Sequence, residues 1–571
     1  MPFSIHRLRI WLLVGAALLV MVIAGFLGYA RYRTHRFLAG LPAKLGVDIR
    51  RETNGYTYSQ SIKGKTVMTL HAAKAVEHVN GKLTLHDVGM ILYGRSQDRM
   101  DRISGSEFEY DQATGVVRAV GEVHIDLEAP SAAVAGHATP STKPAPMVPA
   151  GPDEESKRTI HVKTSGLVYL QKLGIAATDQ DLEFRFGGMT GRATGAEYNS
   201  DTGVLILQSA VKANGLQHGH PVVLTASHAE LERTNQRAVL TQANYISPGQ
   251  AVRGDHAIVH LRKGGSPERI EAEGNVVLKS PTAGSVTAPH ADVLLNEAGQ
   301  AQTAHLFGGV QYDHVTGLRE GKGYAQDARI SFDAAGSPAN IVLDGKVHVN
   351  DRARATEASS SPWTVRDATA GRMTFTLVND GSGRHKELRD AVAAGAAYLT
   401  LVAAAGTPAA ATSELAGDTL QGRFTGEGKA VQLSGITGTG HTSLRRLSGQ
   451  GAEQTSAGDT LEVTLRPAAK RMGAANQTGS EQIAKAVQAG HVVLTSKAAP
   501  KPAGRAKGAV TAATQAAVPV TTRATADLGV YDGDADHLTL TGHAQVTEDA
   551  STVSADRIIL EHASGDVTAD G

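Results

Sequence analysis

The sequence predicts an all-β protein, an elongated antiparallel sheet made of stacked hairpins. The prediction comes from one pattern that appears three times in succession between residues 254 and 350. In each copy an alanine opens a short alternating run, a glycine follows 17 residues later, and Gly-x-Val leads a second alternating run. The alanines are Ala257, Ala291 and Ala328, and the glycines are Gly274, Gly308 and Gly345.

The alternation has a period of two, which is typical of strands with one apolar face. In the first copy Ile270, Ala272 and Val276 share a face, and Glu271 and Glu273 lie on the other. One such hairpin buries too little to be stable alone, so we expect successive hairpins to stack edge to edge. A sheet of this length should fold over, giving a sandwich, a folded trough or a β-helix. The fixed glycine would permit the bend.

Composition excludes several functional classes. Lys and Arg number 56 and Asp and Glu also number 56, with a pI near 7.4, so there is no electrostatic footprint for nucleic acid. The chain has no cysteine, which excludes disulfides and thiolate chemistry. Its cores must come from aliphatic residues, because aromatic residues are only 4%.

The N-terminal segment, residues 1–36, is expected to hold a transmembrane helix. Residues 10–30 carry no charge, and 21 residues at 1.5 Å each are enough to cross a hydrocarbon core of about 30 Å. A cleaved signal peptide is the alternative, but this run is longer than the usual signal and continues directly into Arg31 and Arg33. Because positive charges lie on both sides, they do not fix the orientation.

Four further segments follow the anchor. Residues 37–128 form a first β unit that carries Gly121, residues 129–158 are a proline-rich linker or loop, and residues 159–351 hold the clear repeats. Residues 352–571 hold degenerate copies near Gly395, Gly435 and Gly490 and a better one at Gly542, separated by low-complexity insertions at 400–417, 467–480 and 497–524 that should be loops. The last copy reaches only Gly571, so we expect a fragment or an edge that another chain completes.

Motifs for chemistry are weak, so we expect no enzyme, no cofactor and no metal site. A nucleotide loop at Gly64-Lys65-Thr66 would need a further glycine where Ser59 stands. The acidic run at 532–537 lacks the glycine of a calcium loop and is better explained as a hairpin turn. His218 and His220 supply at most half a metal site. The many carboxylates on the polar strand faces are explained as solvent-exposed surface, without a catalytic pair of acid and base.

The anchor followed by hairpins that read A-E-G-N-V, L-D-G-K-V, A-V-G-E-V and F-G-G-V resembles the lipopolysaccharide-transport families LptC and LptA, the OstA-like domain. The likeness is to LptC over the anchor and residues 37–128, to LptA over about 160–350, and weaker over 367–571. It implies a V-shaped trough of antiparallel strands (a β-taco or β-jellyroll) behind the transmembrane helix. It also implies that successive proteins join edge to edge.

The resemblance implies a non-catalytic part of a lipopolysaccharide export bridge. The chain would be a single-pass inner-membrane protein with its C-terminal bulk in the periplasm. Its partners would be lipopolysaccharide or a related lipid, an inner-membrane ABC transporter that supplies energy, and other β-trough proteins. The alternatives are a carbohydrate-active β-helix enzyme and a passive β-repeat scaffold.

An apolar groove would serve transport because exposed acyl chains cost about 0.8 kcal/mol per CH2, or on the order of 10 kcal/mol for a 14-carbon chain. The alternative is that the same residues fill a closed sandwich core. Candidate groove residues follow the glycine on its own face, and the candidate structural glycines mark the bend. The groove candidates are Val123, Ile125, Val276, Leu278, Val310, Tyr312, Val347 and Val349, and the glycines are Gly121, Gly274, Gly308, Gly345 and Gly542.

Overall fold

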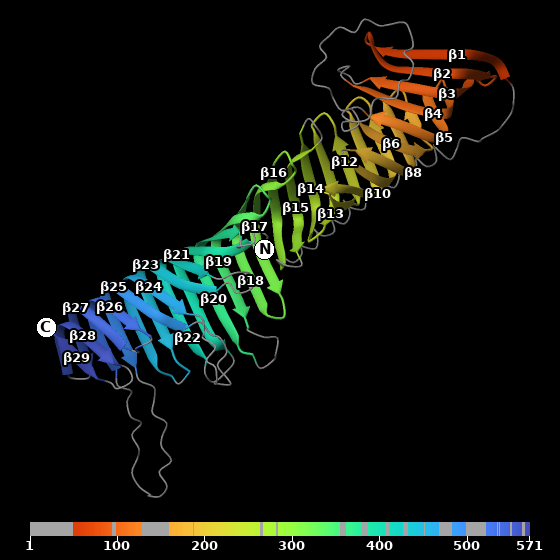
Figure 1. The fold of residues 1–571 in the computed structure, drawn as a ribbon. Helices are drawn as coiled ribbons and strands as arrows, with labels where there is room; N and C mark the ends of the chain where they lie inside the picture. Colours follow the sequence, from red (N-terminus) through yellow and green to blue (C-terminus); the bar gives the residue numbers. More distant parts are fainter. Residues whose placement is uncertain are drawn as a thin grey trace, which may run out of the picture.

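The computed structural model forms one elongated antiparallel sheet (Figure 1). It describes residues 49–571 apart from 94–98, 128–158, 187, 218, 263–265, 281–283, 355–360, 380–385, 406–409, 426–431, 450, 467–481, 498–520, 534, 536, 549–550 and 562–565. These residues form 29 strands and no helix. The prediction of an all-β antiparallel fold is therefore confirmed.

The strands run along the molecule in chain order, from β1 at one end to β29 at the other (Figure 1). The first half comprises β1 Ile49–Ile62, β2 Lys65–His78, β3 Lys82–Tyr93, β4 Met100–Asp111, β5 Val116–Leu127, β6 Ile160–Ser165, β7 Val168–Leu170, β8 Ile175–Phe186, β9 Met189–Asn199, β10 Val204–Gln217, β11 His220–Ala226, β12 His228–Glu232, β13 Arg237–Ser247, β14 Gln250–Leu261 and β15 Pro267–Ser280. The second half comprises β16 Gly284–Leu295, β17 Ala301–Val315, β18 Arg319–Phe332, β19 Pro338–Ala353, β20 Trp363–Asn379, β21 Lys386–Ala405, β22 Ala411–Thr425, β23 Gln432–Leu447, β24 Glu453–Arg466, β25 Gln482–Lys497, β26 Thr521–Asp532, β27 His537–Glu548, β28 Ser551–Glu561 and β29 Val567–Asp570.

Pairing is sequential. From β13 to β29 each strand pairs with the next, as do β1 to β5. Two rungs are split in two: β6 and β7 lie side by side between β5 and β8, and β11 and β12 do so between β10 and β13. Backbone pairing therefore joins each strand only to its neighbours, as in a solenoid.

Most strands bend near their middle, where the register shifts. In β15 the shift falls between Glu273 and Val276, and Gly274 and Asn275 both take a positive φ, of 74° and 47°. A Cβ on Gly274 would meet the Asp255 carboxylate at 2.7 Å, so glycine is needed there for space as well as for its conformation. The same left-handed pair recurs in every second strand to β27, at Gly308/Gly309, Gly345/Lys346, Gly395/Ala396, Gly440/His441, Gly490/His491 and Gly542/His543.

The bends divide the sheet into two wings. Wing 1 holds the half-strands that follow the bend in β15, β17, β19, β21, β23, β25 and β27 and their paired halves, and wing 2 holds the other halves. The wings face each other: a Cβ on Gly529 of wing 2 would lie 3.6 Å from Leu494 of wing 1. We call the ends of the wings that lie away from the bend their lips.

The core is dense at the N-terminal end and thinner beyond it. One cluster of 34 buried residues extends from Met68 to Ala257 and includes Phe108, Tyr110 and Tyr198. Further along, smaller clusters follow one another, around Leu306, around Leu415 and around Leu540. Since the strand pairing is continuous, the difference lies in how fully the space between the wings is filled.

The expected transmembrane helix at 10–30 lies outside the described residues. In the part of the chain that the structure describes, no helix is long and apolar enough to cross a membrane, because the apolar residues alternate along strands. This finding overturns the prediction of a single-pass inner-membrane protein with its C-terminal bulk in the periplasm, and we do not retain that localisation.

Three local predictions also need comment. The proline-rich segment 129–158 lies outside the described residues. The loop expected at 400–417 is wrong, because most of it belongs to β21 and β22; its small residues alternate as strand residues do. The degenerate copy near Gly435 is displaced: Gly435 is paired within β23, and the bend falls at Gly440 and His441.

Candidate functional site: the groove between the wings

An apolar groove lies between the two wings at the C-terminal end of the molecule. It encloses about 270 Å³ and is lined by residues from β23 to β29. Wing 1 contributes Leu444, Leu494 and Val546, and wing 2 contributes Ile483, Leu538 and Leu560. An apolar cavity of roughly 150 Å³ already admits benzene, so this groove has room for a length of hydrocarbon.

Local sequence explains how these side chains reach the groove. In β25 the residues Val492 and Leu494 follow the bend glycine Gly490 at a spacing of two, and in β27 Leu540 precedes Gly542 while Val546 follows it. Side chains two apart on a strand point to the same face. Residues near the bend are buried and form the floor, and those farther along each half-strand, such as Leu494, are half-buried and form the walls.

A polar group interrupts this floor. Gln488 of wing 2 is only 3% exposed; its amide donates to Thr442 Oγ1 of wing 1 at 2.7 Å and accepts from Ser456 Oγ at 3.0 Å. The Thr442 hydroxyl donates in turn to the Gly458 carbonyl at 2.8 Å. Because every partner is satisfied, the cluster joins the wings near the bend rather than offering a free binding group.

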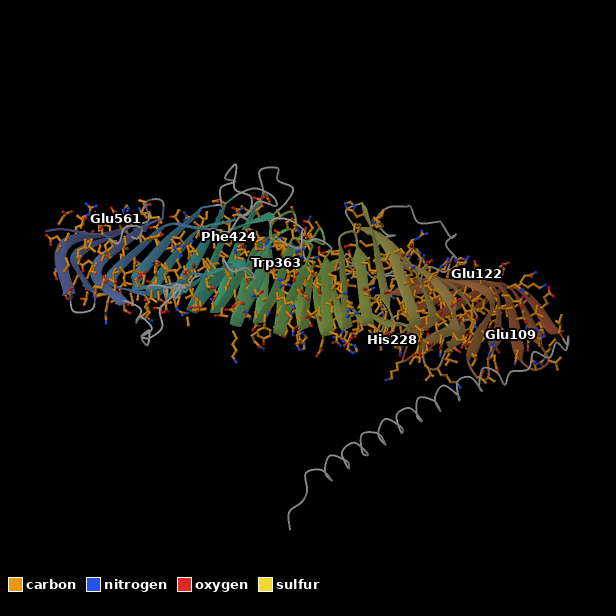
Figure 2. The ribbon with its side chains drawn as sticks, turned by 90° about the horizontal axis from the view of Figure 1, so that it is seen from below. Glu109, Glu122, His228, Trp363, Phe424 and Glu561 are labelled. Carbon is orange, nitrogen blue, oxygen red and sulfur yellow. The ribbon has the colours of Figure 1, made fainter. Side chains whose placement is uncertain are left out.

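Charged residues line the rim of the groove. Arg446 and Glu548 stand on wing 1, and Glu561 and Asp566 stand on wing 2. Figure 2 labels Glu561 at the end of the molecule opposite to Glu109 and Glu122. Nearby, Arg445 donates to Glu453 at 2.7 Å and to Glu414 at 3.1 Å, and the hydrogen bond between Arg445 and Glu453 lowers the pKa of Glu453. An apolar interior with a charged rim suits an amphiphile whose polar part stays in water.

Facing apolar residues also occupy the space between the wings in the middle of the molecule. A cluster there takes Leu343 and Phe375 from wing 2 and Val349, Leu399 and Leu401 from wing 1, all of them partly exposed. The two wings thus present facing apolar residues that do not bury one another completely.

The predicted groove residues fall into three environments. Val276, Val310 and Val347 are buried next to the bend. Leu278, Tyr312 and Val349 lie farther from it and are more accessible; Tyr312 is 37% exposed, and partial burial raises the pKa of its phenol. Val123 and Ile125 are buried within the dense N-terminal core. Lipid contact at these residues stays a prediction.

The predicted structural glycines all take a positive φ. Gly121, Gly274, Gly308, Gly345 and Gly542 have φ between 74° and 94°, and each lies at a register shift between strands. The C-terminal lining was missed as a site because the copy at Gly490 looked degenerate. The alternation Gly490, Val492, Leu494 was the available signal.

A second hollow, of about 610 Å³, lies on the outer face of wing 1 across β5, β6, β8, β9 and β10. It is polar, and it holds exposed ion pairs: Lys163 with Glu122 at 2.8 Å, and Arg192 with Glu183 at 2.8 Å. The Lys163 hydrogen bond lowers the pKa of Glu122, and the same bond raises that of Lys163. These paired, exposed charges explain the hollow as a solvated surface.

Among the described residues, no group of three or more His, Asp or Glu side chains is placed to hold a metal ion. His220 begins β11, and His218 lies outside the described residues. The segment Gly64-Lys65-Thr66 is the turn between β1 and β2 and the start of β2.

Comparison with known proteins connects this end of the molecule to lipopolysaccharide transport. Residues 454–566 match the family model described as LptA/(LptD N-terminal domain) LPS transport protein. The matched residues form most of the groove lining. The match supports the lipopolysaccharide-transport, OstA-like resemblance, without distinguishing LptC or LptA in particular. It points to transport rather than catalysis.

No curated protein matches the chain. Among solved structures, a crystal structure of TcdB2-TccC3-Cdc42 is 7% identical with a TM-score of 0.07, and one of TcdB2-TccC3-TEV is 8% identical with a TM-score of 0.06. The alignments cover 92% and 94% of this chain but only 35% and 36% of those chains. Likeness at this level carries no argument about fold or function.

Proposed function

We propose that this protein is a non-catalytic carrier of lipopolysaccharide or a related amphiphile, whose acyl chains lie in the groove between the wings. The observation that carries the proposal is that the segment matching the transport family and the apolar groove coincide. Covering a 14-carbon chain would remove a barrier on the order of 10 kcal/mol. The sugars would stay outside, at the charged rim.

Two kinds of partner complete the proposal. Directed movement needs energy, which we assign to an ABC transporter. Other trough proteins would pair with this sheet edge to edge. Within the described residues, β29 pairs with Arg557–Leu560 of β28, whereas the half of β28 from Ser551 to Ala555 pairs with β27 on one side. An unpaired strand edge is a ready template for another strand.

Site-specific photocrosslinking tests the function. A photoreactive residue replaces Leu494 in the groove wall, and the matched control replaces Glu462, an exposed residue that lies between Leu461 and Val463 on β24. With purified lipopolysaccharide added, we expect a covalent adduct at Leu494 and little at Glu462. Equal adducts at both positions, or none at either, would contradict a groove that binds lipid and would favour a passive scaffold.

A further inference from the structure

Hydrogen bonds join wing 1 to the lip of wing 2 at the N-terminal end of the sheet. Tyr56 and Tyr58 of β1 belong to wing 1 through their pairing with β2. The Gln112 amide of wing 2 donates to Tyr56 Oη at 3.3 Å, and the Gln171 amide donates to Tyr58 Oη at 3.3 Å. Gln171 also accepts from Tyr110 Oη at 3.3 Å. These contacts cross the mouth that the two wings would otherwise leave open.

A buried ion pair crosses the same mouth farther along. Asp101, at the lip of wing 1, is 1% exposed, and Arg233, at the lip of wing 2, is 4% exposed; Nη1 of Arg233 donates to Asp101 Oδ1 at 2.8 Å. Tyr198 of wing 2 donates its hydroxyl to the other oxygen of Asp101 and accepts from Arg233 at 3.1 Å. Burial is the largest cause of the raised pKa of Tyr198, so it remains a donor at neutral pH.

A second arginine secures this junction. Nη2 of Arg99 donates to the carbonyl of Ser200 at 3.1 Å and to that of Asp201 at 3.4 Å, both in the turn between β9 and β10 on wing 2. A Cβ on Gly203 would stand 1.5 Å from Nη1 of Arg99, so this glycine makes room for the guanidinium. We call the contacts made by Tyr56, Tyr58, Arg99 and Asp101 across the mouth the seam.

Behind the seam the space between the wings is filled. The cluster from Met68 to Ala257 includes Val123 at 0% exposure and Phe108 at 1%. Among the described residues from β14 onward, ion pairs at the lips join strands of the same wing, as Arg319 does with Asp351 at 2.7 Å on wing 1 and Lys386 does with Asp333 at 2.6 Å on wing 2. The ion pair that crosses the mouth thus lies before β14, and the apolar groove lies between β23 and β29.

We propose that the region from β1 to β13 carries no lipid and that the binding groove for an acylated amphiphile begins near β14 and runs to β29. This inference rests on the proposed function and sets the limits of its site. To admit a chain into the sealed part, Asp101 and Arg233 would have to separate and the packed side chains would have to move. Separating a buried ion pair is costly because each charge loses a close opposite charge in an interior that offers little solvation. Entry to the open part needs no such step.

Crosslinks between introduced cysteines test whether the two regions differ in lipid binding. The chain has no cysteine of its own, so each crosslink forms only at the chosen pair. In a seam lock, Tyr56→Cys and Gln112→Cys are joined by a short bismaleimide. In a groove lock, Glu548→Cys and Glu561→Cys, which line the C-terminal groove from opposite wings, are joined by the same kind of reagent with a matching span. The readout is the lipopolysaccharide adduct at a photoreactive residue that replaces Leu494.

We expect the seam lock to leave the adduct unchanged and the groove lock to reduce it about tenfold, a change in binding of about 1.4 kcal/mol. A seam lock that reduces the adduct as much as the groove lock overturns the inference and leaves the proposed function standing. A lipopolysaccharide adduct at a photoreactive residue that replaces Val123 would also overturn the inference and leave the proposed function standing. No adduct at Leu494 even in the unlocked chain overturns the proposed function and this inference together.

Discussion

At the scale of single residues, the bends carry a repeated polar contact on the outside of the molecule. The residue after the bend glycine is a histidine in β23, β25 and β27, and each histidine bonds through Nδ1 to an aspartate on the preceding strand. The pairs are His441 with Asp418 at 3.1 Å, His491 with Asp459 at 2.8 Å and His543 with Asp527 at 2.8 Å. All three are exposed, so their effect on stability is small.

His543 gives a titration prediction. The hydrogen bond with Asp527 raises the pKa of His543 above its usual value of 6.5. A raised folded-state pKa means that the contribution to stability is complete below the pKa of the unfolded chain and is lost as pH rises through the folded pKa. NMR titration should therefore place the pKa of His543 above 6.5, and Asp527→Asn should lower it. An unchanged pKa in that variant would contradict the pairing.

The buried ion pair gives a stability prediction. Arg233→Met removes the arginine from the buried ion pair with Asp101, which should cost about 3–5 kcal/mol, and Tyr198→Phe should cost about 1–3 kcal/mol through a lost hydrogen bond. The matched control, Arg192→Gln, removes an exposed pair with Glu183 and should cost under about 1 kcal/mol. Urea denaturation, with hydrogen exchange of the β4 amides as the readout, measures the free energy of unfolding of all three variants. Equal effects in the three variants would argue against a buried junction.

At the scale of elements, the bend glycine is the determinant of each rung. Gly274→Ala places a Cβ 2.7 Å from the Asp255 carboxylate on a residue with positive φ, so we expect a loss of about 1–2 kcal/mol or more. Gly89→Ala is the control, since its Cβ would meet nothing within 4 Å and its φ is not in the left-handed region. We expect that change to be neutral or slightly stabilising. Thermal unfolding compares the two variants, and equal melting temperatures would contradict the requirement for glycine at the bend.

Much of the element-scale structure could be predicted from the sequence. Period-two alternation indicates strands directly, and the Gly-x-Val step falls where β15, β17 and β19 bend. The bends in β10 and β13 had no such signal, because Ala210 and Gln242 adopt the positive φ there without a glycine. The seam could not be predicted, since Asp101 and Arg233 are 132 residues apart and meet only through the fold of the sheet.

At the scale of the whole molecule, stability should be local. Leu415 is 1% exposed and belongs to the central cluster, which is separate from the N-terminal cluster around Phe108. Leu415→Ala should cost about 2–5 kcal/mol. Because backbone pairing joins each strand only to its neighbours and the two clusters are separate, hydrogen exchange should accelerate in β20 to β24 and stay unchanged in β2 to β5. Acceleration along the full length would indicate one cooperative unit instead.

One continuous sheet (Figure 1) thus holds two kinds of interior, a densely packed sandwich at the N-terminal end and an apolar groove at the C-terminal end. The groove could be anticipated in kind from the sequence, as an apolar face behind each glycine. The position of the groove along the sheet could not be predicted, because residues of the same alternating pattern are packed in the core at Val123 and line the groove at Leu494. How far apart the wings lie depends on side-chain size and on contacts between distant strands.

Native mass spectrometry of the detergent-free protein with lipopolysaccharide tests the central claim most directly. The double variant Leu494→Asp and Leu538→Asp places a carboxylate on each wall of the groove, where an ionised group would lose its solvation to a bound acyl chain. We predict a lipopolysaccharide adduct on the unaltered protein and a loss of at least about tenfold in the double variant. An adduct of equal abundance on both proteins, with the variant folded, would contradict the account.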